Sequence, residues 1–197
     1  MKKFIIILLL AVLIIVAFIF THKSNDRTKE EVVKESYDIP SEYAGFIENY
    51  SALYNVPPEI VCAVIKAESD FDPSSVSHAG AIGLMQITEP TLWWLQSKLG
   101  ETHTTEELYD SETNIKYGTF FLSLLYTEFG DWQTVYAAYN AGRTKVNGWL
   151  KDESVSQNGV LIDIPIEETA NYVKKVAEYR IKYHSVYYPE TQTGENQ

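Results

Sequence analysis

The most informative part of this chain of 197 residues is the segment 68–91, which reads ESDFDPSSVSHAGAIGLMQITEPT. It begins at Glu68, the last residue of the mostly apolar segment 58–68, PEIVCAVIKAE. That segment predicts a short helix from Ile60 to Glu68, which Pro58 can open. The Ser, Gly and Asp residues that follow predict a loop over residues 69–83. A carboxylic acid therefore stands where an apolar helix meets a polar loop.

The neighbours of Glu68 in that helix give it an unusual environment. Val64 and Ile65 lie four and three residues earlier, so Glu68 shares their apolar face. Burial and the negative end of the helix dipole both raise the pKa of a carboxyl. A carboxyl kept protonated near neutral pH can act as a general acid. The alternative is a helix-end Glu that reaches solvent, and position alone does not decide between the two.

The segment resembles the first signature of the lytic transglycosylases with the soluble-transglycosylase (SLT) domain, relatives of goose-type lysozyme. The matching residues are Glu68, Ser69, Phe71, Pro73, Ser77, Gly80, Ala81, Gly83, Leu84, Met85, Gln86, Ile87 and Thr91. The Pro that usually stands two residues after Ile87 is displaced to Pro90, and we expect only a small local change at the groove wall. Three further blocks match in order: Asn114-Ile115-x-x-Gly118-x-x-x-Leu122, Ala137 to Gly142 with Val146 and Trp149, and Pro165-x-x-Glu168-Thr169-x-x-Tyr172-Val173.

This resemblance implies a fold and a reaction. The fold is a mostly α, lysozyme-like (goose-type) helical domain with a substrate groove, and the substrate is the glycan strand of peptidoglycan. The enzyme would be a lyase that cleaves the β-1,4 bond from N-acetylmuramic acid to N-acetylglucosamine, with Glu68 as the single general acid and base. The C6 hydroxyl of the muramic acid would attack in place of water and leave a 1,6-anhydro ring. Because this attack is intramolecular, a second carboxylate is dispensable.

The resemblance also implies a substrate-binding set, which consists of Ser77, Gln86, Thr88, Tyr139, Asn140 and Glu168. Ser77 would orient the muramic acid, and Gln86 and the backbone near Thr88 would line the groove. Tyr139 would support the Glu68 side of the cleft, and Asn140 would fix the site. A purely structural role stays open for two of these residues. Ser77 could make only a local hydrogen bond within its turn, and Glu168 could only complement the dipole at the start of the last helix.

Two other functions remain open. A muramidase of the same fold would add water and would need a second carboxylate, for which Asp70, Asp72 and Glu89 are candidates. The sequence offers no clear second carboxylate, which argues against this. A non-catalytic, membrane-tethered glycan-binding scaffold would keep the groove without turnover, and the full motif around Glu68 argues against that.

Composition narrows the possible partners. The chain has 16 Lys and Arg against 27 Asp and Glu, a formal net charge of −11, which argues against nucleic-acid binding. Its single cysteine, Cys62, excludes an internal disulfide. The histidines are scattered without metal-ligand spacing, so we expect no metal and no cofactor.

The N-terminal segment predicts a membrane anchor. Residues 4–20 are an unbroken apolar run of roughly 25 Å as a helix, at the short end of what spans a bilayer. No clean small-residue cleavage site follows, so residues 1–20 favour an uncleaved anchor over a cleaved signal and secretion. Residues 21–40 then form a juxtamembrane linker, 41–188 the catalytic domain and 189–197 a polar tail. We expect a single-pass protein of the cytoplasmic membrane with its domain on the extracytoplasmic side.

Hydrophobic periodicity and caps predict the remaining helices of the domain. The first runs from an N-cap at Ser41 to the Pro57-Pro58 pair. The others are expected at 90–99, 110–129, 132–140, 143–150 and 167–184, with an extended stretch possible at 160–164. Gly100 and Gly130 should end two of them, and residues 104–107 have the form of a capping box.

Overall fold

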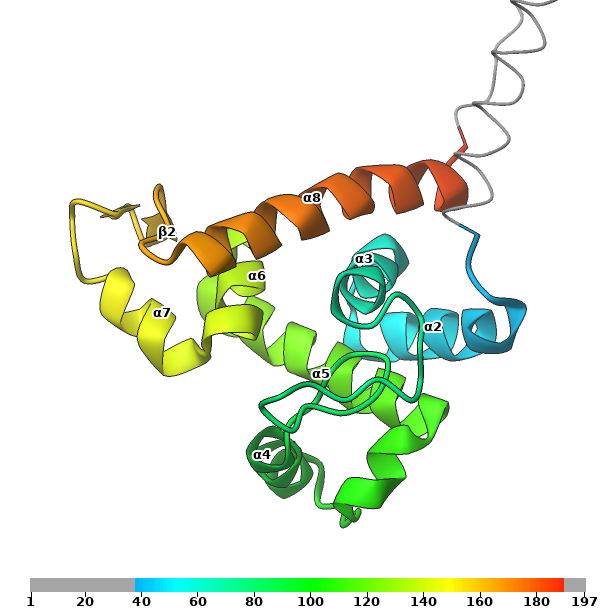
Figure 1. Ribbon diagram of the computed structural model, residues 1–197. Helices are drawn as coiled ribbons and strands as arrows, with labels where there is room; N and C mark the ends of the chain where they lie inside the picture. Colours follow the sequence, from blue (N-terminus) through cyan, green and yellow to red (C-terminus); the bar gives the residue numbers. More distant parts are fainter. Residues whose placement is uncertain (1–37, 190–197) are drawn as a thin grey trace, which may run out of the picture. The chain divides into compact units, whose positions relative to one another are not determined.

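The computed structural model describes residues 38–189, and that part of the chain is mostly helical, as predicted (Figure 1). The elements in chain order are α2 (Ser41–Tyr54), α3 (Pro58–Glu68), α4 (Glu89–Leu99), the 3-10 helix η1 (Thr105–Tyr109), α5 (Ser111–Phe129), α6 (Trp132–Ala141), α7 (Arg143–Trp149), β1 (Ser156–Gln157), β2 (Val160–Leu161) and α8 (Glu167–Tyr187). The two short strands pair antiparallel, with Ser156 opposite Leu161.

The predicted anchor over residues 1–20 lies outside the described residues, as do nearly all of the linker at 21–40 and of the tail at 189–197. Between residues 38 and 189, no helix combines the length and the apolar composition that crossing a bilayer requires. The assignment of residues 4–20 to the membrane therefore stays a prediction.

The predicted helix ends agree with the structure to within three residues. Helix α3 begins at Pro58 and not at Ile60, and α8 ends at Tyr187 and not at residue 184. Gly100 and Gly130 adopt left-handed φ values of 70° and 67°, and the capping box at residues 104–107 is formed. Ser41 was predicted as an N-cap, but Pro40 holds that position, since its ring fixes a φ of −53° that leads directly into the helix. Asp110 precedes α5 as its N-cap, because its carboxylate accepts a hydrogen bond from the Thr113 amide.

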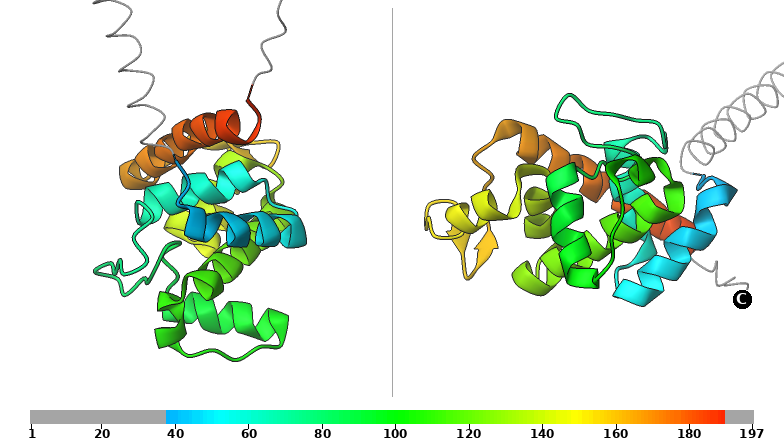
Figure 2. Two further views of the ribbon diagram at one scale, coloured as in Figure 1. Left: turned by 90° about the vertical axis from the view of Figure 1, so that its right-hand side faces the viewer. Right: turned by 90° about the horizontal axis from the view of Figure 1, so that it is seen from below.

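Helix α3 forms the centre of the domain. Residues 60–65 have no exposed surface at all, so this helix is apolar on every side. It packs along α8 and against α2, while α5 packs against α2 and α6 (Figures 1 and 2). The helix reaches solvent only at its ends, where Pro58 and residues 66–68 are partly exposed, and Glu68 is its last residue.

The long loop at residues 69–88 follows Glu68 and is fixed by Asn114 of α5. This fully buried amide accepts a hydrogen bond of 2.7 Å from the Met85 N–H. Its Nδ2 group donates at 2.8 Å to the carbonyls of Ile82 and Leu108. A Cβ atom at Gly83 would collide with the Asn114 side chain, and one at Gly118 would collide with Met85, so both positions require glycine.

The loop also carries backbone strain. Asp70, Phe71 and Gln86 have φ values of 56°, 64° and 50°, in the left-handed region that residues with a side chain seldom adopt. Such conformations persist where the surroundings enforce them. Here the enforcing contacts include the Ser69 hydroxyl, which donates to the Leu84 carbonyl at 2.8 Å.

Asn114→Ala tests the anchoring of this loop. The variant leaves the Met85 amide and the Ile82 and Leu108 carbonyls without their buried partner, so we expect the free energy of unfolding to fall by about 3–5 kcal/mol. Asn171→Ala, on the exposed side of α8, should change it by no more than about 0.5 kcal/mol. Chemical denaturation measures both. A loss below about 1 kcal/mol for Asn114→Ala would show that the loop is held by other contacts.

Candidate active site

Glu68 lies at the open end of α3, where its side chain is partly buried and faces α8. The hydroxyl of Tyr172 in α8 donates a hydrogen bond of 2.6 Å to its Oε1 atom. Burial raises the pKa of Glu68 to about 7, against smaller lowering effects of the Tyr172 hydrogen bond and the Lys175 ammonium group. No carboxylate is among the groups that shift this pKa. Of the two environments that its position left open, the structure has the partly buried one, and a carboxyl with this pKa can exchange a proton near neutral pH.

A second tyrosine, Tyr139 of α6, lies beside the same carboxyl. Its hydroxyl donates to the Met85 carbonyl at 2.7 Å and so ties α6 to the loop at 69–88. Burial and the nearby Glu68 charge hold the pKa of both Tyr139 and Tyr172 well above the usual value. Both phenols therefore remain hydrogen-bond donors at every pH at which Glu68 titrates.

Asn140 and Thr169 join the end of α6 to the start of α8. The Thr169 hydroxyl donates to the Asn140 Oδ1 atom at 2.8 Å. This bond fixes the Asn140 amide next to Tyr139 and near the helix turn that carries Tyr172. Glu168 precedes Thr169 in the first turn of α8 and is exposed, so the dipole role and the sugar role both remain open to it.

The other predicted binding residues shape the loop itself. The Gln86 amide group donates to the carbonyls of Ser75 and Gly83 at 3.0 and 2.9 Å. The exposed Ser77 hydroxyl accepts a bond from the Ala81 amide at 3.1 Å, which is the local turn bond of the alternative interpretation. Thr88 precedes α4 and shares a 2.9 Å hydroxyl–hydroxyl bond with Thr91. These contacts leave the Gln86 Oε1 atom and the Ser77 hydroxyl proton as groups that a sugar could meet.

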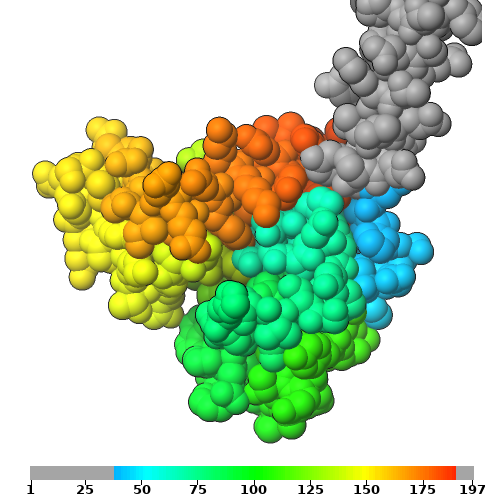
Figure 3. Space-filling model, viewed as in Figure 1, coloured from blue at the N-terminus to red at the C-terminus, as the bar shows by residue number. Residues whose placement is uncertain are grey.

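A hollow adjoins this cluster. It has a volume of about 340 Å³ and is lined by Pro90, Thr91, Trp94, Phe121, Gly142 and Arg143. The Phe121 ring lies 5.1 Å from the Tyr139 ring, which connects the hollow to the Glu68 cluster. The space-filling view is indented between the yellow segment that holds α7 and the green segment that holds α4 (Figure 3). Larger hollows of about 590 and 560 Å³ are lined by neither Glu68, Tyr139 nor Tyr172, so their size does not make them the reaction site.

The main site residue that was not predicted is Tyr172. It belongs to the last sequence block, but nothing in the spacing of that block shows that its hydroxyl reaches back to Glu68. The sequence separation of 104 residues explains why helical periodicity could not reveal the contact. Within residues 38–189, no three His, Cys, Asp or Glu side chains are grouped so that they could hold a metal ion.

Glu68→Gln tests the burial of the carboxyl without an activity assay. The pKa of Glu68 is about 7 in the folded protein, above its ordinary value of 4.5. Protonation of Glu68 therefore stabilises the folded wild type. This contribution is fully present below pH 4.5 and is lost as the pH rises through 7. The variant cannot ionise, so between pH 4 and pH 8 it should gain about 1–3 kcal/mol in free energy of unfolding relative to the wild type. Denaturation curves across that range measure the gain. A difference that is constant with pH would contradict the burial of Glu68.

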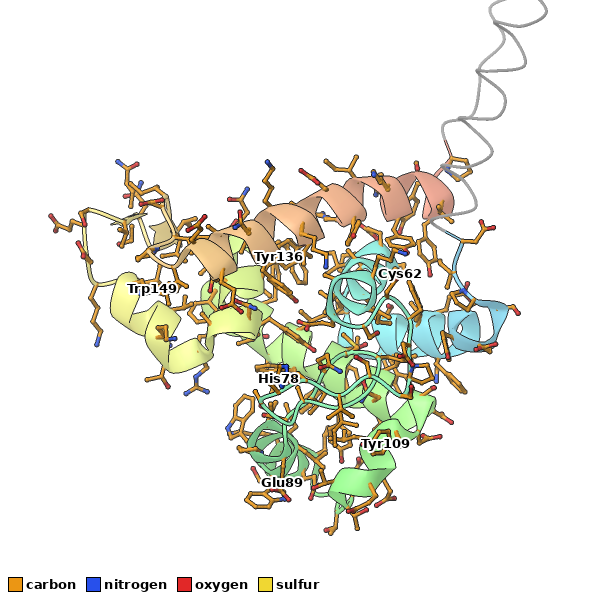
Figure 4. All side chains as sticks on the ribbon, in the orientation of Figure 1. Cys62, His78, Glu89, Tyr109, Tyr136 and Trp149 are labelled. Carbon is orange, nitrogen blue, oxygen red and sulfur yellow. The ribbon has the colours of Figure 1, made fainter. Side chains whose placement is uncertain are left out.

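Tyr172→Phe tests the hydrogen bond. Its loss removes a contact that favours the ionised carboxylate, so the pKa of Glu68 should rise above about 7. The shift is read from the pH dependence of the Glu68 carboxyl ¹³C signal. Tyr109→Phe, at an exposed ring near η1 (Figure 4), should leave that signal unchanged. An unchanged or lowered Glu68 pKa in Tyr172→Phe would show that the two side chains do not interact in solution.

Comparison with known proteins shows the family to which the chain belongs. The chain is 33% identical over 158 residues to the soluble lytic murein transglycosylase of Escherichia coli K12, a match that covers 73% of this chain and 23% of that protein. It is 27% identical over 166 residues to membrane-bound lytic murein transglycosylase C of Actinobacillus pleuropneumoniae, covering 72% of this chain and 46% of that protein.

Solved structures agree with the sequence comparison. The 70 kDa soluble lytic transglycosylase from Escherichia coli superimposes with a TM-score of 0.70 at 29% identity, over 79% of this chain and 26% of that one. An inactive mutant of a lytic transglycosylase from Pseudomonas aeruginosa gives a TM-score of 0.68 at 30% identity, over 75% of this chain and 25% of that one. The chain thus spans about a quarter of the length of these two proteins. The family model described as the transglycosylase SLT domain matches residues 45–160, and the chain belongs to this family.

Proposed function

We propose that this protein is a membrane-anchored lytic transglycosylase of peptidoglycan, which cleaves the bond from N-acetylmuramic acid to N-acetylglucosamine and forms 1,6-anhydro ends. The observation that carries the proposal is Glu68, whose pKa of about 7 is set by burial, a tyrosine and a lysine without a second carboxylate. The names of the relatives, soluble and membrane-bound lytic murein transglycosylases, support the same reaction class.

The proposed reaction uses Glu68 twice. Its protonated carboxyl gives the proton to the glycosidic oxygen while the bond from that oxygen to C1 of the muramic acid breaks. The resulting carboxylate then takes the proton of the C6 hydroxyl as that oxygen bonds to C1. The 1,6-anhydro ring closes without consuming water, and Glu68 returns to its protonated state. Because Tyr172 occupies Oε1, the Oε2 atom is the one free to exchange the proton.

The candidates for a second carboxylate are engaged elsewhere, which disfavours the muramidase alternative. Asp70 forms an ion pair with Lys66 and is largely exposed. Asp72 accepts hydrogen bonds from the amide and the hydroxyl of Ser74, each within its own turn. Glu89 accepts from Thr105 at 2.9 Å and lies at the lower edge of the molecule, far from α3 (Figure 4). None of these three carboxylates is among the groups that shift the pKa of Glu68.

We also propose where the enzyme works. Residues 4–20 would hold the protein in the cytoplasmic membrane, with the catalytic domain on the extracytoplasmic side next to the glycan strands. The name of the membrane-bound relative supports attachment to a membrane. Release of the domain after cleavage of the N-terminal segment is the alternative, and the mass of the mature protein in fractionated cells distinguishes the two.

Glu68→Gln tests the proposed enzyme. The variant keeps the size of the side chain but loses the exchangeable proton, so release of soluble muropeptides from purified peptidoglycan should fall by about 10³-fold or more. Binding to peptidoglycan should persist. The exposed Glu178→Gln in α8 should release muropeptides at the wild-type rate.

Two outcomes would overturn the enzyme proposal. If folded wild-type protein binds strands but releases nothing, the scaffold alternative holds. If Glu68→Gln retains its turnover, another group is the acid.

A further inference from the structure

The hollow beside Tyr139 combines an apolar wall with a single cationic side chain. Trp94 comes from α4 and Phe121 from α5, and their rings meet edge to face at 6.0 Å. Arg143, the first residue of α7, completes the lining from the opposite side. Since Phe121 also contacts the Tyr139 ring, this hollow lies one aromatic ring away from the Glu68 cluster.

The guanidinium group of Arg143 is held in place by two contacts. Its central carbon lies 5.4 Å from the centre of the Trp94 ring, within the range of a cation–π interaction. Its Nε atom lies 3.3 Å from Oε2 of Glu128, whose other oxygen accepts a 2.7 Å bond from Asn147. The side chain is nevertheless 47% exposed. The salt bridge uses Nε and leaves the two terminal amino groups, which can meet a carboxylate in a paired geometry.

The proposed substrate limits what such a cation could recognise. The sugar rings of a peptidoglycan strand are neutral, and its anions are carboxylates carried by the muramic acid. These are the lactyl carboxylate of a peptide-free strand or the carboxylates of an attached stem peptide. A cation fixed on the groove wall of a protein with a net charge of −11 therefore matches the muramyl substituent and not the sugar backbone.

We propose that Arg143 is a specificity-determining residue, which binds a carboxylate of the muramyl substituent in the hollow that Trp94 and Phe121 line. This rests on the proposed function. If Arg143 has this role, the enzyme should cleave strands that bear carboxylates in preference to strands of equal length without free carboxylates. A purely structural Arg143 would tie α7 to Trp94 and Glu128 without any such preference.

The test uses the full-length protein with Arg143→Gln, which removes the charge and keeps most of the length. Three substrates are compared: peptide-bearing strands, peptide-free strands, and peptide-bearing strands whose amines are acetylated and whose carboxylates are then converted to methylamides. Because Arg143 is half exposed, kcat/KM should fall by about three- to fivefold on carboxylate-bearing strands. It should stay unchanged on methylamide strands. Lys145→Gln removes a charge from an exposed position on the same short helix and should not discriminate among the substrates.

The three substrates distinguish which carboxylate Arg143 binds. A loss confined to peptide-bearing strands assigns the stem carboxylates, and a loss that includes peptide-free strands assigns the lactyl carboxylate. An equal loss on all three substrates, or none, overturns the inference. Failure of the wild type to cleave any strand would overturn the proposed function instead. If Arg143→Gln does not fold, the wild type alone decides, because it should cleave carboxylate-bearing strands about three- to fivefold better than methylamide strands.

Discussion

The candidate site depends on one carboxyl held at the end of a helix whose middle, residues 60–65, is fully buried. Packing on every side of these residues fixes the helix, and with it the backbone that carries Glu68. Burial then raises the pKa of Glu68 to about 7, and the Tyr172 hydrogen bond and Lys175 keep it from rising further. These opposing effects keep the pKa of Glu68 near neutral pH, where a carboxyl can serve first as an acid and then as a base.

The loop that follows Glu68 needs the same rigidity, and α5 supplies it. Asn114 fixes the loop backbone at Met85 and Ile82, and Tyr139 reaches the Met85 carbonyl from α6. The loop at 69–88, α6 and α8 thus meet around Glu68 through side chains that donate to backbone carbonyls or to the carboxyl itself. Strained backbone at Asp70, Phe71 and Gln86 is tolerated because these contacts determine the loop conformation.

Much of this arrangement could be predicted from the sequence, since its signals are local. The helix over 60–68, the glycine ends at Gly100 and Gly130, and the position of Glu68 all follow from short-range patterns. The contact from Tyr172 to Glu68 could not be predicted, because it joins residues that only the crossing of α3 and α8 brings together. Asn114 was recognised as part of a motif, but its three buried hydrogen bonds depend on the tertiary fold. The same limit applies to Arg143, whose contact with Trp94 joins α7 to α4.

The central claim is that Glu68 works alone and that the substrate supplies the nucleophile. The chemical form of the product ends tests this most directly. The full chain is incubated with purified peptidoglycan, and the released muropeptides are analysed by mass spectrometry. A single acid and base predicts muramic acid ends that are lighter than hydrolysed ends by one molecule of water, as 1,6-anhydro rings. Reducing muramic acid ends would contradict the account and would require a second, water-activating carboxylate in the groove.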